Sequence, residues 1–160
     1  MTRIAVTGHI NLTPETTTLV RAAIHDMLAA REEPRELVGI SCIAAGADQI
    51  FAQVILEMGG QLEVILPSAD YRESKVQPDN LTAFDDLLTR ASHVREMPYP
   101  HANKQAYEAA NRTLLTSADR LLAVWDGKPS DGAGTADVVQ HARSLGLPVD
   151  VVWPTGAQRG

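Results

Sequence analysis

The chain has 160 residues, of which 44% are hydrophobic and 21% charged, and its formal net charge is −6. This length is enough for one domain with a substantial core, and the composition is that of a globular protein and not of a disordered one. No stretch approaches the roughly 20 apolar residues of a membrane span. The single cysteine, Cys42, excludes an internal disulfide.

The first residues have neither the basic nor the apolar region of a signal peptide, so we expect a cytoplasmic protein with no membrane partner. The excess of acidic residues argues against nucleic acid as a partner, because proteins that bind phosphate backbones concentrate Lys and Arg. Here the 14 basic residues are scattered along the sequence. A ligand the size of a nucleotide fits this composition better.

Short apolar runs alternate with amphipathic helical patterns along the chain. Strands are predicted at 4–6, 37–40, 62–66, 93–96, 121–125 and 149–153. Helices are predicted between them, the first with Thr13 as N-cap and Pro14 at its first position. This alternation predicts one doubly wound, Rossmann-like α/β domain over residues 1–155, with a mostly parallel sheet of about six strands flanked by helices. Residues 156–160 are expected to be a flexible tail.

Ligands of such sheets bind outside the carboxyl ends of the strands, which places segments 7–11, 41–48, 67–75 and 126–135 at one edge. In the first segment, Gly8 allows close approach of the backbone to a ligand, and His9 can donate a hydrogen bond to a phosphate or purine. The alternative is that Gly8 is an ordinary turn glycine and His9 an exposed histidine. In the second, the small residues Ala45 and Gly46 leave helix-start amides bare. Asp48 either binds a ligand hydroxyl or complements the helix N-terminus.

In the third segment, Arg72 can clamp a phosphate with two hydrogen bonds, or can be a solvated loop charge. Tyr107, which precedes the fifth predicted strand, can stack on a base or lie in the core.

The fifth predicted strand ends at Asp126 and Gly127, and Gly132, Gly134 and Thr135 then lead into a helical pattern. A buried strand followed by a glycine-rich turn and a helix N-terminus is typical of a site that presents backbone N–H groups to a phosphate. The histidines lack metal-ligand spacing, and neither a dinucleotide fingerprint nor a P-loop motif occurs. We therefore expect no metal and no cofactor.

Several stretches together resemble the SLOG superfamily, the Rossmann-like group that includes the LOG phosphoribohydrolases and the DprA proteins. Residues 41–48 are similar to its glycine-containing turn, 59–67 to its third-strand entry, 107–112 to its Arg/Asn helix and 132–135 to its G-x-G-T phosphate loop. The resemblance implies a nucleotide-derived ligand whose sugar or base is oriented by Asn111. It also implies a homodimer or higher homo-oligomer.

The sequence departs from the LOG enzymes at their catalytic positions. The arginine and glutamate of those enzymes fall on Ala110 and Val138 here, so Arg112 or Asp137 would have to replace them. Whether the chain is an enzyme stays open at this stage.

Three functions are compatible with these residues. The first is binding of a nucleotide or nucleotide-derived phosphate ligand. The second is cleavage or transfer at an N-glycosidic bond of a nucleoside phosphate, with Asp126 or Asp137 stabilising an oxocarbenium-like centre. The third is a non-catalytic oligomerisation or interaction module.

Overall fold

The computed structural model describes residues 2–30, 34–130 and 134–160. These residues form one sheet of six strands: β1 (Thr2–Gly8), β2 (Leu37–Ser41), β3 (Gln61–Leu66), β4 (His93–Glu96), β5 (Arg120–Val124) and β6 (Val149–Val152). All neighbouring strands are parallel, and their order is β4-β3-β2-β1-β5-β6. The predicted doubly wound α/β fold with about six strands is confirmed.

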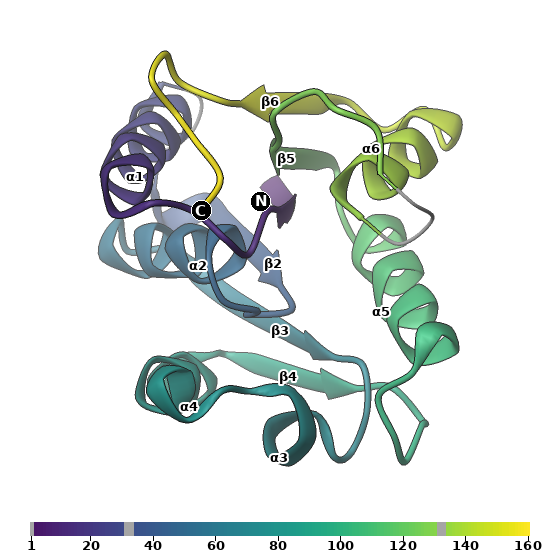
Figure 1. Cartoon of the computed structure of the whole chain (residues 1–160). Coiled ribbons are helices and arrows are strands. Elements are labelled where there is room, and N and C mark those ends of the chain that lie inside the picture. Colours follow the sequence, from purple (N-terminus) through teal and green to yellow (C-terminus); the bar gives the residue numbers. More distant parts are fainter. Residues whose placement is uncertain (1, 31–33, 131–133) are drawn as a thin grey trace.

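The same residues form helices α1 (Pro14–Ala29), α2 (Ala47–Glu57), α3 (Tyr71–Lys75), α4 (Leu81–Arg90), α5 (Lys104–Thr116) and α6 (Thr135–Ser144). Two short 3₁₀ turns, Pro34–Glu36 and Pro78–Asn80, precede β2 and α4. Helices α1, α2 and α4 cover one face of the sheet, and α5 and α6 cover the other (Figure 1). None of the helices in the described residues has the length and apolar character needed to span a bilayer.

The core follows from strands that are buried on both faces. All five residues of β2 are buried, as its continuous apolar run predicts for an inner parallel strand. Gly39 lets α2 pack directly on β2, because a Cβ at this position would lie 2.7 Å from Ile55 Cγ1. At the start of α1, Thr13 Oγ1 accepts a hydrogen bond from the Thr16 N–H at 3.2 Å, in the N-cap role that the sequence predicts.

The strand order reverses at β1. The chain builds β2, β3 and β4 on one side of β1 and then returns to place β5 and β6 on the other. The crossovers after β1 and β5 therefore leave for opposite faces, so that a crevice opens at the carboxyl ends of these two strands.

The C-terminal residues contact the segment that follows β1. The Gln158 N–H donates to Thr16 Oγ1 at 2.7 Å, and the Gly160 N–H donates to the Asn11 carbonyl at 2.6 Å. Leu12 and Arg159 form an isolated antiparallel bridge. The backbone donors of this segment thus find acceptors in the loop between β1 and α1 and in the first turn of α1.

Candidate functional site

A cleft of about 1220 Å³ lies at the carboxyl edge of the sheet, where β1 and β5 end. All four segments that the sequence places at this edge contribute residues to its walls, and α5 and α6 complete them. Parallel strands end at the same edge, so loops far apart in the sequence meet here.

Gly8 and Gly46 bring the end of β1 and the start of α2 close together. A Cβ on Gly8, which lines the cleft, would lie 2.5 Å from Ala47 Cβ. Gly46 has a φ of 81°, and a Cβ there would lie 2.6 Å from the His9 carbonyl oxygen. Ala45 lines the cleft, whereas Gly46 is packed beneath the loop after β1 and does not line it. These glycines serve backbone packing.

The ring of His9 lines the cleft, but its Nε2 accepts a hydrogen bond from the Asp126 N–H at 3.1 Å. The ring packs in a T-shaped arrangement with Trp153, with 5.5 Å between ring centroids. Burial and the nearby Arg159 guanidinium lower the pKa of His9, and Asp126 only partly offsets them. The ring is therefore a neutral acceptor that ties the end of β1 to the end of β5.

The Asp126 carboxylate forms contacts of its own beside the hydrogen bond to His9. Its Oδ1 accepts the Lys128 N–H at 2.9 Å, and its Oδ2 lies 3.7 Å from Arg159 Nη1. Burial alone would raise the pKa of Asp126, but the Lys128 N–H, His9 and Arg159 together hold it below its usual value. Neither Asp126 nor Gly127 lines the cleft. The carboxylate predicted to face a reacting sugar instead orders a loop.

Asp137 caps helix α6. Its Oδ2 accepts the Gly134 N–H at 3.0 Å and the Ser130 hydroxyl at 2.6 Å. Gly134 is needed here because a Cβ would lie 2.5 Å from Ser130 Cβ. Asp137 lines the cleft in this capping role, and Gly132 lies outside the described residues. The second carboxylate of the hydrolase hypothesis is thus also engaged with the backbone.

The first turn of α6 still offers donors to the cleft. The N–H groups of a helix's first turn have no acceptor within the helix, and the backbone N–H that Asp137 Oδ2 accepts is that of Gly134, just before this turn. Thr135 and Ala136 both line the cleft. Their amides, together with the positive end of the helix dipole, favour an anion at this wall.

Asp48 lies on the opposite wall, in the first turn of α2. Its own carbonyl accepts the Ser41 hydroxyl at 3.1 Å, which holds this turn against the end of β2. Burial raises the pKa of the Asp48 carboxyl to about 7, against a lowering contribution from the Ala44 N–H. Asp48 therefore faces the cleft as a carboxyl group whose pKa lies close to neutral pH.

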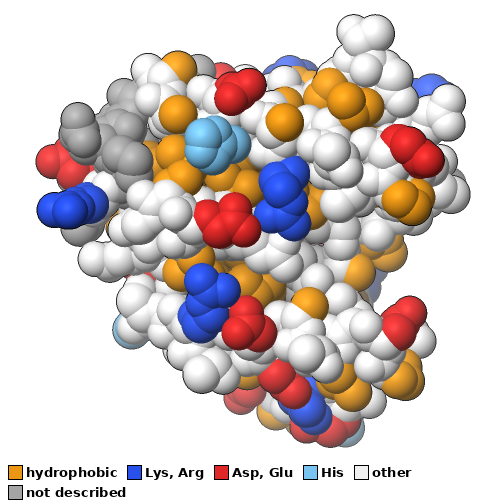
Figure 2. All heavy atoms as spheres, turned by 90° about the vertical axis from the view of Figure 1, so that its left-hand side faces the viewer, with side chains coloured by type: hydrophobic (Ala, Val, Ile, Leu, Met, Phe, Trp, Pro, Cys, Tyr) orange, Lys and Arg blue, Asp and Glu red, His pale blue; other side chains and the backbone are white. Residues whose placement is uncertain are grey.

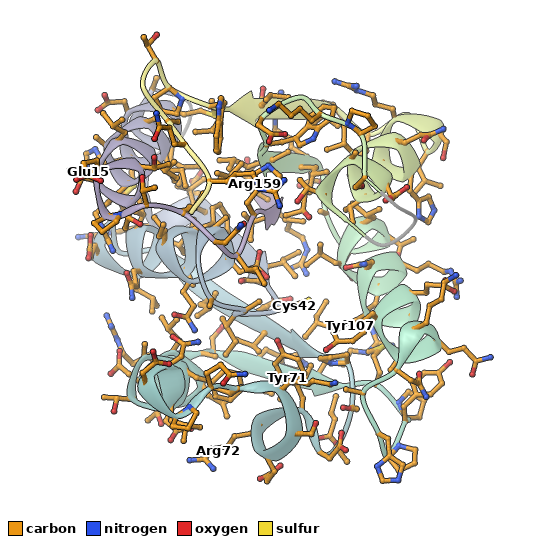
Figure 3. The ribbon with its side chains drawn as sticks, viewed as in Figure 1. Glu15, Cys42, Tyr71, Arg72, Tyr107 and Arg159 are labelled. Atoms are coloured by element: carbon orange, nitrogen blue, oxygen red, sulfur yellow. The ribbon has the colours of Figure 1, made fainter. Side chains whose placement is uncertain are left out.

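Helix α3 presents Tyr71 to the cleft and turns Arg72 away from it (Figure 3). Arg72 Nε and Nη2 donate to the two carboxylate oxygens of Asp85, at 2.8 and 2.7 Å. The predicted segment reaches the cleft through Tyr71 and not through Arg72, because neighbouring residues of a helix project about 100° apart. Arg72 is therefore placed in a surface ion pair and not in the cleft.

Helix α5 supplies Tyr107 and Asn111 to the cleft wall. The Tyr107 ring packs edge-on against Tyr71, with 6.4 Å between centroids. Tyr107 is nevertheless 37% exposed, so part of its ring is open to a ligand.

Cationic side chains gather in the cleft, although the sequence shows them scattered. Five of the 14 Lys and Arg residues line it, namely Lys75, Lys104, Arg112, Lys128 and Arg159. Only four of the 20 Asp and Glu residues do so, namely Asp48, Asp79, Glu108 and Asp137. Within the described part of the chain, the first four of these cations form no ion pair. On the face that α1, α2 and α4 form, acidic and basic side chains are instead interspersed (Figure 2).

The loop that carries Lys128 is held in place by Trp125, whose Nε1–H donates to the Lys128 carbonyl at 2.9 Å. Sequence reasoning missed Lys128 and Arg159 because they come from separate loops that only the fold brings together. Over the described residues, no three His, Cys, Asp or Glu side chains are grouped so that they could hold a metal ion.

No family model and no curated protein matches the sequence. Solved structures share its fold. DprA from Streptococcus pneumoniae is 18% identical with a TM-score of 0.73, over 98% of this chain and 52% of that one. DprA from Helicobacter pylori is 16% identical with a TM-score of 0.65, over 99% and 68%. The molybdenum cofactor carrier protein of Chlamydomonas reinhardtii is 15% identical with a TM-score of 0.59, over 94% and 75%.

The chain has a SLOG-type fold. The superfamily resemblance seen in the sequence is thereby confirmed at the level of the fold. The chain spans about half the length of the pneumococcal DprA.

The argument from net charge against nucleic acid is wrong. The DprA from Helicobacter pylori shares this fold, and its structure describes how that protein binds single-stranded DNA. Overall charge is a poor guide for such a fold because the charge of the cleft differs from that of the rest of the surface.

Proposed function

We propose that this SLOG-type domain binds a nucleotide or a nucleotide-derived phosphate ligand in the cleft. The observation that carries the proposal is the convergence of the first-turn amides of α6 with cations that have no described ion-pair partner. Backbone N–H groups at a helix N-terminus and Lys or Arg side chains are the donors that proteins use for phosphate.

The phosphate would lie against Thr135 and Ala136, and Lys128 and Arg112 would contribute positive charge. The Asp137 carboxylate occupies the Gly134 N–H, so the phosphate would bind one step further into the helix than the glycines of the loop suggest. The remainder of the ligand would extend toward Asp48 and the tyrosines. The volume of about 1220 Å³ exceeds the roughly 300–1,000 Å³ usual for small-molecule sites.

The proposal is tested by calorimetry with the four common nucleoside monophosphates and the matching nucleosides. The monophosphates should bind, and the nucleosides should bind at least about tenfold more weakly, since they lack the charged acceptor. Equal affinity for both series would contradict a phosphate site. A short oligonucleotide serves as a further arm: if it binds while no mononucleotide does, the ligand is a nucleic acid chain and the small-ligand proposal is wrong.

Thr135→Pro removes the first amide of α6 while preserving the helix. Proline is well tolerated at the first helical position, and Gly134, with φ −97° and ψ −173°, already has the extended conformation that proline requires of its predecessor. This variant should bind the monophosphates about tenfold more weakly. Thr135→Val is the matched control, because it keeps the N–H and removes only the hydroxyl. If Thr135→Pro binds as tightly as wild type, the phosphate does not lie at α6.

A further inference from the structure

The cleft contains an aromatic and acidic region that phosphate binding does not explain. It consists of Asp48 from α2, Cys42 from the loop after β2, Tyr71 from α3 and Tyr107 from α5, and we call it the Asp48 subsite. The side chains of Cys42, Tyr71 and Tyr107 converge on one region between α2 and α5 (Figure 3). Arg159 lines the same cleft but lies on the far side of it from Tyr71 in that view.

The Asp48 carboxyl is short of hydrogen-bond donors. The Ala44 N–H donates to it, and among the described residues no side chain does so. Two of its neighbours are uncharged at pH 7, because burial and the Asp48 charge raise the pKa of the Cys42 thiol and of the Tyr71 phenol. Burial and the neighbouring Asp70 and Cys42 likewise raise the pKa of Tyr107.

An ionised carboxylate presents two acceptor oxygens and no donor. Asp48 is half-buried and faces the cleft, so a ligand that supplies two adjacent N–H groups would pair with acceptor oxygens for which the protein provides few donors. Tyrosine rings beside the carboxylate offer apolar and aromatic surface for a planar heterocycle.

We propose that the Asp48 subsite binds the 2-amino-4-oxopyrimidine edge of a guanine or pterin ring, with its ring N–H and exocyclic amino group donating to the two carboxylate oxygens of Asp48. This inference rests on the proposed function, since it assigns the ring of the same ligand. Adenine and cytosine place an acceptor nitrogen beside their amino group, and uracil places its N–H between two carbonyls. A carboxylate disfavours each of these edges.

The test is calorimetry with GMP, IMP, AMP and XMP at about pH 8, where Asp48 is mostly ionised. Wild type should bind GMP at least about tenfold more tightly than AMP, with IMP, which lacks the 2-amino group, between them. In Asp48→Asn the amide offers one donor and one acceptor. GMP should then weaken about tenfold, and XMP, whose 2-oxo group replaces the amino group, should gain affinity.

Glu108→Gln is the control, because it removes a negative charge from the same cleft outside the subsite and should leave the order of affinities unchanged. Neopterin carries the same ring edge but no phosphate, so its affinity relative to guanosine, which also lacks phosphate, tells whether the site takes pterins or guanine. Equal binding of GMP and AMP by wild type, or unaltered GMP binding by Asp48→Asn, overturns this inference alone. Failure of every nucleotide and of neopterin to bind overturns the proposed function as well.

Discussion

The imidazole of His9 accepts a hydrogen bond from the backbone N–H of Asp126, with 3.1 Å between Nε2 and N. The contact ties the end of β1 to the end of β5 at the point where the strand order reverses. Nε2 can accept only while it is unprotonated. Protonation of His9 would therefore disrupt the junction on which the cleft is built.

This contact predicts a dependence of stability on pH. The pKa of His9 is lowered by burial and by Arg159, so the unfolded chain binds more protons below pH 6.5 than the folded one does. The contribution of neutral His9 to the stability of the fold is complete above pH 6.5, and it is lost as the pH falls toward the lowered pKa of His9 in the folded protein. His9→Phe keeps an aromatic edge near Trp153 and cannot titrate, so its thermal midpoint should fall less than that of wild type between about pH 7 and pH 5. His25→Gln, at an exposed position of α1, is the control. Parallel curves for His9→Phe and wild type would contradict this account.

Asp48 predicts the opposite slope. Its folded pKa of about 7 lies above the ordinary 3.8, so its contribution to stability is greatest below pH 3.8 and is lost as the pH rises through 7. Asp48→Asn cannot ionise. Its thermal midpoint relative to wild type should therefore rise steadily from about pH 4 to pH 8. A difference that stays constant over this range would show that the carboxyl titrates normally and is well solvated.

Gly46 and Gly127 form a matched pair for the close approach beneath the cleft. Both have positive φ, 81° and 83°, but a Cβ on Gly46 would lie 2.6 Å from the His9 carbonyl oxygen, whereas nothing lies within 4 Å of one on Gly127. Alanine at either position is destabilised by the positive φ, and Gly46→Ala is destabilised further by the clash of its Cβ with the backbone of His9. Gly46→Ala should lose about 1–3 kcal/mol more in free energy of unfolding, measured in urea. Equal losses would mean that the α2 start can shift at no cost.

Arg72 and Arg112 differ in their position relative to the cleft, so their variants test where the ligand binds. Arg72 is paired with Asp85 outside the cleft, whereas Arg112 lines the cleft and forms no ion pair with a described residue. Arg72→Ala should leave nucleotide affinity unchanged and change stability little, because solvent screens an exposed ion pair. Arg112→Ala should weaken nucleotide binding, and more so at low ionic strength, where the charge is less screened. A loss of affinity in Arg72→Ala would contradict the placement of the site.

The fold was accessible from the sequence because its signals are local. The apolar run of β2 and the cap formed by Thr13 and Pro14 lie within a few residues of the structure that they specify. The edge of the sheet that carries the cleft was also accessible, since it follows from parallel strands alone. The homo-oligomer implied by the superfamily resemblance stays a prediction.

The roles of individual side chains were not accessible, because they depend on distant partners. Asp126 is drawn into a loop by His9, which lies 117 positions away, and Thr16 holds Gln158 across 142 positions. Asp137 caps α6 only because Gly134 lets Ser130 approach. No periodicity or motif records such contacts.

The most direct test of the central claim is a titration of ¹⁵N-labelled protein with GMP, followed by amide resonances. The account predicts saturable shifts at Thr135 and Ala136, the first two residues of α6, with further shifts around Asp48, and little change at residues of α1 that face solvent. Saturable binding that leaves the Thr135 and Ala136 amides unmoved would contradict the account.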